Sequence, residues 1–109
     1  MDLNKYRIMW IFVFFDLPTN TKKERKSAAH FRKNLIKDGF NMMQYSVYMR
    51  HCPSRENAET HIRRVKSFLP PKGMVSILRV TDMQFGMMES YVGKVETGIP
   101  EVSYQLEFF

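Results

Sequence analysis

The side chain best placed to do chemistry in this 109-residue chain is a single carboxylate, Asp16. Residues 6–15 are almost all apolar, mostly aromatic or β-branched, and they run directly into Asp16 and then Leu17-Pro18. Burying an unpaired carboxylate is costly, so an aspartate at the exit of a buried strand favours a cation as its partner. The structural alternative is that Asp16 caps the turn before a helix or pairs with a nearby cationic side chain.

One aspartate makes only half of a metal site. Hard divalent cations bind carboxylate oxygens, and one such residue per chain suffices only where a two-fold axis brings two copies together. Ser46 and Tyr48 are weaker candidates, as hydrogen-bond donors to the same cleft. The three histidines are dispersed along the chain, and the single Cys52 builds neither a zinc site nor an internal disulfide.

The first third of the chain predicts a strand followed by a helix. Residues 6–15 are too few for an ordinary helix and are expected as a central strand of a sheet. Thr21 and Glu24 have the spacing of a capping box, so we expect a helix that begins there and stops at Asp38-Gly39. Its apolar side would hold Ala28, Phe31 and Leu35.

The next segments predict a further helix between β-structures. Residues 39–50 favour one strand or a bent pair of strands. Pro53-Ser54 begin a second helix, which Pro70-Pro71 end. Residues 74–81 are expected as another strand, with Val75, Ile77 and Arg79 on one face. The apolar stripe of the second helix would hold Ala58, Ile62, Val65 and Leu69.

This order of elements predicts an α+β domain, a ferredoxin-like βαββαβ-type sandwich. Two helices would cover one face of the sheet, so the other face would be bare in a monomer and we expect a homodimer that buries it. The side chains expected on that face are Trp10, Phe12, Phe14, Tyr45 and Val47.

The end of the chain predicts one more strand. Residues 102–108 alternate apolar and polar side chains, and this extra C-terminal strand would pack on the partner subunit or simply close a sheet edge. Its partner-binding candidates are Val102, Tyr104, Leu106 and Phe108. The domain would span residues 1–92, and residues 93–109 would form a flexible approach plus that strand.

Charge favours a polyanionic partner. The chain holds 17 Lys and Arg against 11 Asp and Glu, which gives a net charge of +6. A solvated, soluble surface is the simpler explanation, whereas sequence-independent binding of phosphates is the functional one. The candidate nucleic-acid contacts are Lys22, Lys23, Lys26, Lys33 and Lys37 on the first helix and Arg63 and Arg64 on the second. Arg25 and Arg32 are expected instead to hold the first helix against neighbouring carboxylates.

Several other classes are disfavoured. No apolar stretch approaches the ~20 residues of a membrane helix, and the lone cysteine and the lack of a signal peptide favour a cytoplasmic location. An RNA-binding domain of this topology would carry aromatic RNP motifs, which are missing. A ligand-sensing ferredoxin-like domain would not need the positive charge.

Four short motifs resemble those of the CRISPR-associated protein 2 family in their order and spacing. The resemblance extends over nearly the whole chain. The motifs are Phe14 to Thr19; Gly39-Phe40 with Gln44 to Tyr48; Lys72-Gly73 before a strand ending at Val80-Thr81; and Gln84-Phe85.

The resemblance implies two functions of different kinds. One is a homodimeric scaffold in the spacer-acquisition complex, flanked by dimers of the CRISPR-associated protein 1 integrase, with double-stranded prespacer DNA lying across it. The other is a magnesium- or manganese-dependent endonuclease acting on RNA or DNA, whose metal-binding and catalytic aspartate matches Asp16. No convincing second catalytic group accompanies Asp16, which weighs against a dedicated nuclease.

Overall fold

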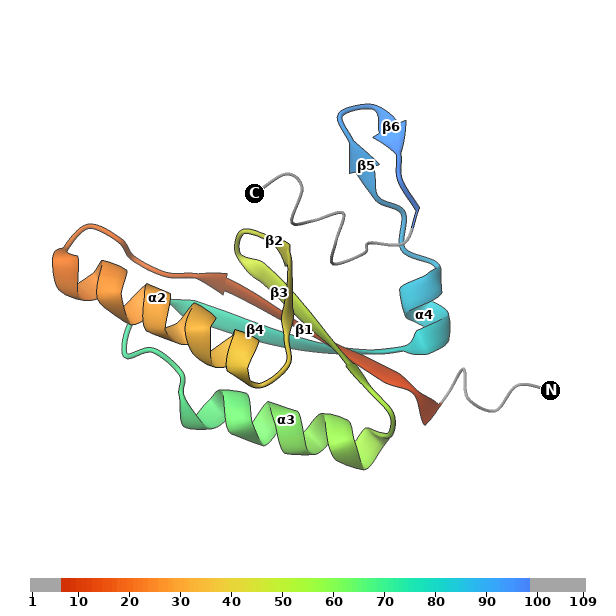
Figure 1. Cartoon of the computed structure of the whole chain (residues 1–109), viewed down its shortest axis with the longest axis horizontal. Coiled ribbons are helices and arrows are strands. Elements are labelled where there is room, and N and C mark those ends of the chain that lie inside the picture. The colour runs from red at the N-terminus through yellow and green to blue at the C-terminus, as the bar shows by residue number, and fades with distance from the viewer. Residues whose placement is uncertain (1–6, 99–109) are drawn as a thin grey trace.

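The computed structural model describes residues 7–98, which form a four-stranded antiparallel sheet and two long helices (Figure 1). The order along the chain is β1 (Met9–Asp16), α2 (Lys22–Lys37), β2 (Asn41–Gln44), β3 (Val47–Cys52), α3 (Arg55–Ser67) and β4 (Met74–Thr81). Across the sheet the strand order is β2-β3-β1-β4, and all neighbours are antiparallel. The ferredoxin-like prediction is therefore confirmed, and residues 39–50 contain β2 and the start of β3 rather than one strand.

The central strand β1 divides its side chains between two cores. Its residues alternate between the faces of the sheet, as in any strand. Met9, Ile11, Val13 and Phe15 lie in the main core with buried residues of both long helices. Trp10 and Phe12 belong to a smaller cluster on the opposite face. The predicted central position of this strand is confirmed by its pairing with both β3 and β4.

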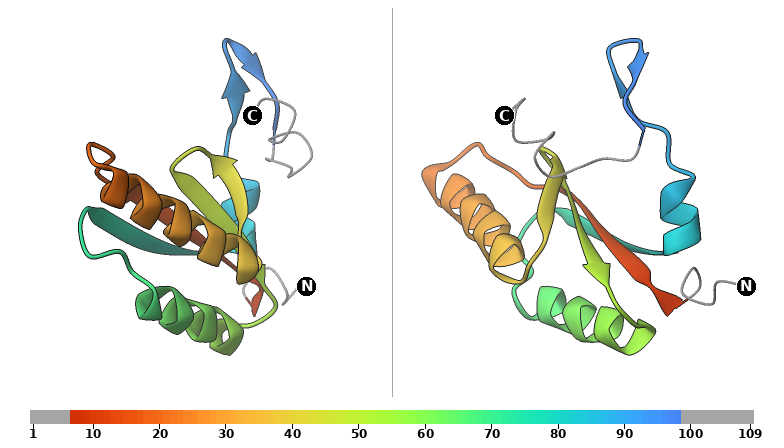
Figure 2. Two further views of the ribbon diagram at one scale, coloured as in Figure 1. Left: turned by 60° about the vertical axis from the view of Figure 1, so that its left-hand side comes forward. Right: turned by 45° about the vertical axis from the view of Figure 1, so that its right-hand side comes forward.

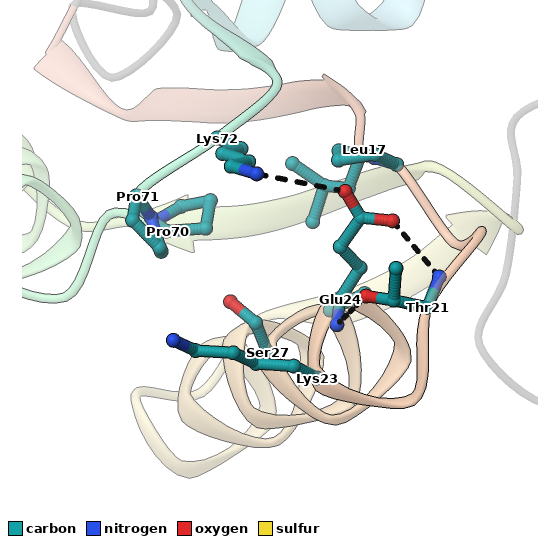
Figure 3. A pocket seen from close by; sticks show the side chains of 10 residues that line it. Leu17, Thr21, Lys23, Glu24, Ser27, Pro70, Pro71 and Lys72 are labelled. Atoms are coloured by element: carbon teal, nitrogen blue, oxygen red, sulfur yellow. Dashed lines mark hydrogen bonds and ion pairs between the residues drawn. The ribbon is translucent and has the colours of Figure 1, made fainter.

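Both long helices cover the same face of the sheet (Figure 2). The predicted capping box at the start of α2 is present, with Thr21 Oγ1 accepting from the backbone N–H of Glu24 at 3.1 Å and the Glu24 carboxylate accepting from that of Thr21 at 3.0 Å (Figure 3). The hydrogen bond from the Thr21 backbone is the main cause of the lowered pKa of Glu24. The predicted core residues of α2 are all buried. None of the helices within residues 7–98 is both long enough and apolar enough to cross a membrane.

The apolar stripe of α3 stops before Leu69. Ala58, Ile62 and Val65 are buried as predicted, but Leu69 is 45% exposed. The helix ends at Ser67, and the C-cap Phe68 leaves helical geometry with φ −124° and ψ 27°, so the helical phase is lost before Leu69. Phe68 packs inward in its place, with its ring 5.8 Å from that of Phe31. The prediction for Leu69 is therefore wrong.

The second face of the sheet is not bare along its whole length. A short helix that the sequence analysis misses, α4 (Asp82–Gly86), lies on the side of the strands opposite to α2 and α3 (Figure 2, right). Phe85 is buried there and stacks on Trp10 with ring centroids 3.8 Å apart, while the Trp10 indole N–H donates to Asp82 Oδ1 at 2.7 Å. This corrects the expectation of a wholly uncovered face, although Phe14 and Leu78 stay exposed beyond α4.

A hairpin of β5 (Tyr91–Val92) and β6 (Val95–Glu96) follows α4 and projects from the body of the protein (Figure 1). The sequence analysis expects a flexible approach from residue 93 onward, whereas residues 93–96 form the turn and second strand of this hairpin. The proposed boundary at residue 92 stays a prediction. The predicted C-terminal strand, with Val102, Tyr104, Leu106 and Phe108, lies outside the described residues.

Gly73 allows the start of β4 to approach the end of β1, and its replacement tests this contact. Its φ is +94°, and a Cβ there would lie 2.7 Å from the carbonyl oxygen of Asp16. Gly73→Ala is therefore expected to lower the free energy of unfolding by about 2–4 kcal/mol, measured by urea denaturation. Gly86→Ala is the matched control, because a Cβ at Gly86 meets no atom within 4 Å, and it should change stability by less than about 1 kcal/mol. Equal stability of the two variants would contradict the close approach.

Candidate metal and nucleic-acid site

Asp16 is the last residue of β1, and it is exposed. Strand alternation puts its side chain on the face that carries Phe14, away from the two long helices, and its register partner on β4 is Met74. Within residues 7–98 the carboxylate makes no hydrogen bond or ion pair. The structural alternative for Asp16 therefore finds no support in the described chain, because Thr21 caps α2 and no cation meets the carboxylate.

Two backbone contacts fix the position of Asp16. The carbonyl of Ser46, in the turn between β2 and β3, accepts from the Phe15 N–H at 3.1 Å, and Gly73 lies against the Asp16 carbonyl. Ser46 thus lies at the same end of the sheet as Asp16, and its hydroxyl has no partner in the described chain. Tyr48, by contrast, is buried under the helices, and burial raises its pKa. The expectation that Tyr48 reaches the Asp16 cleft is wrong, because the two side chains lie on opposite faces of the sheet.

One chain does not complete a metal site around Asp16. The described part of the chain holds no group of three or more His, Cys, Asp or Glu that could bind a metal ion. Magnesium is commonly held by one or two carboxylates and keeps several of its waters. An exposed carboxylate with no partner fits half of such a site, and a second copy of the chain would have to supply the other half.

The predicted phosphate contacts are all on the surface. The lysines of α2 form no ion pair among residues 7–98, so their charges are not neutralised within the fold. These residues, which we call the lysine row, are Lys22, Lys23, Lys26, Lys33 and Lys37. On α3, Arg63 is exposed and donates to Thr60 Oγ1 at 3.3 Å. Arg64 is also exposed, but it donates to Asp38 Oδ1 at 2.9 Å, so its guanidinium already binds a carboxylate.

A cluster of charged side chains that the sequence analysis misses closes the C-terminal end of α2. The Asp38 carboxylate contacts Nδ1 of the buried His61 at 2.8 Å as well as Arg64. Arg50 donates to the Asp38 carbonyl at 2.8 Å. The cluster joins α2, β3 and α3, so it stabilises the fold. The spacing of His61 and Arg64 on one helix is the only local signal for it, since Asp38 is brought there by tertiary structure.

Arg25 and Arg32 do not hold carboxylates among the described residues, and this corrects their predicted role. Arg25 donates to the backbone carbonyls of Thr19 and Asn20, at 3.1 and 3.3 Å. The Arg32 guanidinium lies 4.4 Å from the centre of the Tyr45 ring. Tyr45 sits in the β2–β3 turn over a side chain of α2, not on the open sheet face where the sequence analysis expects it.

Comparison with known proteins now identifies the family. A model of the family described as CRISPR associated protein Cas2 matches residues 9–88, which run from the start of β1 past the end of α4. The chain belongs to the CRISPR-associated Cas2 family. This confirms the resemblance carried by the four motifs, and the matched region includes Asp16, both long helices and the open sheet face.

Individual Cas2 proteins are similar over nearly the full chain. A protein of Flavobacterium psychrophilum is 54% identical over 107 residues, which cover 98% of this chain and 93% of the relative. One of Parvibaculum lavamentivorans is 52% identical over 101 residues, covering 93% of this chain and all of the relative. One of Paracidovorax avenae is 41% identical over 107 residues, covering 98% and 99%. All three carry the name CRISPR-associated endoribonuclease Cas2.

Asp38 is paired with other side chains, whereas Asp16 has no partner in the described chain. Substituting each one tests which carboxylate stabilises the fold. Asp38→Asn removes the charge that faces His61 and Arg64, and it should lower the free energy of unfolding by about 1–3 kcal/mol because Arg64 remains partly solvated. Asp16→Asn should change it by less than about 0.5 kcal/mol, since the carboxylate has no partner in the described chain. Chemical denaturation of both variants measures the contrast. A large destabilisation by Asp16→Asn would show that the carboxylate belongs to the fold.

Proposed function

We propose that the chain is the dimeric, double-stranded-DNA-binding scaffold of a CRISPR adaptation complex, where it bridges dimers of the CRISPR-associated protein 1 integrase. The observation that carries the proposal is the open sheet face, which we define as the side opposite to α2 and α3 and beyond α4. A hollow of about 260 Å³ lies there between apolar side chains of β1, β3, β4 and the α4 region. Among its lining residues are Phe12, Phe14, Val47, Leu78 and Met88.

A second copy of the chain is the occupant that this face fits. Exposed apolar surface in such a cluster is unfavourable in water and typical of an interface. Because Asp16 extends the row of side chains that ends with Phe14, a two-fold axis near this end of β1 would bring both carboxylates together. The same contact would therefore bury the apolar surface and pair the acidic groups.

The charges of the dimer suit DNA of arbitrary sequence. Doubling the formal charge of +6 gives about +12 for two copies. Each copy adds a lysine row with no carboxylate partner among residues 7–98, and lysines that contact only phosphates bind without reading bases. A scaffold that accepts new spacers of any sequence requires this kind of binding.

A metal-dependent endonuclease is the second candidate, and two observations favour it. Asp16 is exposed and has no partner in the described chain, and the similar proteins carry the name endoribonuclease. In a dimer the two copies of Asp16 would hold magnesium or manganese, which would supply charge stabilisation for phosphodiester cleavage of RNA or DNA. The backbone contacts of Ser46 and Gly73 would orient each carboxylate. The scaffold is preferred because no convincing second catalytic group accompanies Asp16 in the sequence, whereas DNA bridging needs only the dimer and its charged surface.

The dimer contact can be tested with two exposed leucines in different places. Leu78 is 48% exposed on the open sheet face, and Leu69 is 45% exposed after α3. Leu78→Glu should weaken dimerisation by at least tenfold, because a carboxylate would be buried in an apolar interface. Leu69→Glu should leave the dimer intact. Sedimentation equilibrium measures both dissociation constants, and a wild-type chain that stays monomeric at working concentrations would exclude the proposal.

The Asp16→Asn variant, tested in the reconstituted complex with the integrase, distinguishes the scaffold function from the endonuclease function. Spacer integration at the wild-type rate, together with normal dimerisation, supports the scaffold, because bridging needs the surface and not the carboxylate. Loss of integration with dimer and complex intact would overturn the scaffold in favour of chemistry at Asp16. Nuclease assays of the purified wild type and the same variant, with magnesium or manganese, exclude a contaminating nuclease as the source of any cleavage.

A further inference from the structure

The guanidinium of Arg32 lacks the partner that such a group usually has. It lies near two aromatic rings, 4.4 Å from the centre of Tyr45 and 5.5 Å from that of Phe15. Its Nε atom is buried without a hydrogen-bond partner. No carboxylate, carbonyl or hydroxyl within residues 7–98 accepts a hydrogen bond from it. An arginine whose guanidinium has no carboxylate partner within the described chain is suited to bind a phosphate from outside the fold.

The ring that covers Arg32 is itself open to solvent. Tyr45 is 61% exposed, although one of its faces lies against the guanidinium. The turn that carries it is held at the end of β1 by the hydrogen bond from Phe15 N–H to the Ser46 carbonyl. An exposed aromatic ring in a fixed turn, backed by a cation, is the combination on which unpaired nucleobases stack.

We propose that Arg32 and Tyr45 form a binding site for an unpaired nucleotide, with Arg32 on the phosphate and Tyr45 stacked on the base. The ligand is a single-stranded segment of DNA or RNA, because a base inside a duplex has no free face to offer the ring. The inference rests on the proposed nucleic-acid function and adds a second mode of binding to it. The lysine row meets the phosphates of a duplex, and the Arg32–Tyr45 site takes a nucleotide where pairing ends.

The position of the site supports this division. Arg32 lies on α2, the helix that also carries the lysine row, so both groups of cations belong to one element. Phe15, whose ring centre lies 5.5 Å from the Arg32 guanidinium, immediately precedes Asp16. The Arg32–Tyr45 site therefore lies at the same end of the sheet as Asp16, but on the face that α2 covers, whereas the Asp16 side chain is on the opposite face.

The test uses fluorescence anisotropy of labelled oligonucleotides with the full chain, in EDTA so that no strand is cleaved. The probes are a blunt DNA duplex, the same duplex with an unpaired extension, and single strands of DNA and RNA. Tyr45→Ala should weaken binding of the extended duplex and of at least one single strand by about tenfold, whereas Tyr45→Phe keeps the ring and should stay within about twofold of wild type. Arg32→Lys keeps the charge but loses the planar donors, and it should weaken the same probes by about fivefold.

The controls distinguish failure of this site from failure of the proposed function. Tyr91→Ala removes a tyrosine of similar exposure, 53%, from the β5–β6 hairpin and should bind every probe as the wild type does. All variants should bind the blunt duplex within about twofold of wild type. Wild-type binding of unpaired probes by Tyr45→Ala, or an equal loss on the blunt duplex, would overturn the inference and leave the scaffold proposal standing. Failure of the wild type to bind the blunt duplex would instead overturn the scaffold. The strand type that loses affinity in Tyr45→Ala identifies the ligand as DNA or RNA.

Discussion

The pairing of β1 with a strand on each side is the constraint on which the rest of the structure depends. Because side chains alternate along a strand, fixing the register of β1 decides which of its residues lie under the helices and which face the open side. Phe15 is thereby placed in the main core, and its neighbours Phe14 and Asp16 on the open side. A slip by one residue would bury Asp16 under the helices, where a carboxylate without a partner is strongly unfavourable. The same register therefore builds the core and exposes the carboxylate.

The charged side chains fall into two groups that differ in their partners. One group is paired across elements far apart in the sequence. Asp38 holds His61 and Arg64, and Arg79 holds Glu59 at 2.6 Å, a hydrogen bond that lowers the pKa of Glu59. The other group, Asp16 and the lysine row, has no partner among the described residues. The Asp38 contacts stabilise the fold, and the half-exposed pair of Arg79 and Glu59 adds little to them. Charges of the second group also contribute little to stability, and they remain free to meet a metal or phosphates.

Local signals predicted much of the fold, and tertiary contacts account for what they missed. Three of these signals each involve only a few neighbouring residues: the capping box of Thr21, the end of the helix at Gly39 and the alternation in β1. Helix α4 carries a capping box of the same kind at Thr81 and Gln84, but its five residues are too few for a helical period to appear. Arg32 contacts a ring in the β2–β3 turn, and Asp38 contacts two side chains of α3. These contacts join distant parts of the chain, so no spacing in the sequence predicts them. Asp16 is recognisable in the sequence because a strand exit is itself a local feature, whereas the second half of the proposed metal site would have to come from another copy of the chain.

The proposed scaffold and the proposed enzyme differ in what they would require of the two Asp16 residues of the proposed dimer. Two carboxylates that meet across a two-fold axis repel each other, so their approach opposes the association that burial of the apolar face favours. A divalent cation between them removes the repulsion, and a cation that binds the dimer and not the monomer stabilises the dimer by mass action. Bridging DNA needs only the associated state, however the repulsion is relieved, so asparagine at position 16 satisfies it without metal. Hydrolysis would need the cation itself, and therefore the carboxylates, which is why one substitution distinguishes two proposed functions that would share the same interface.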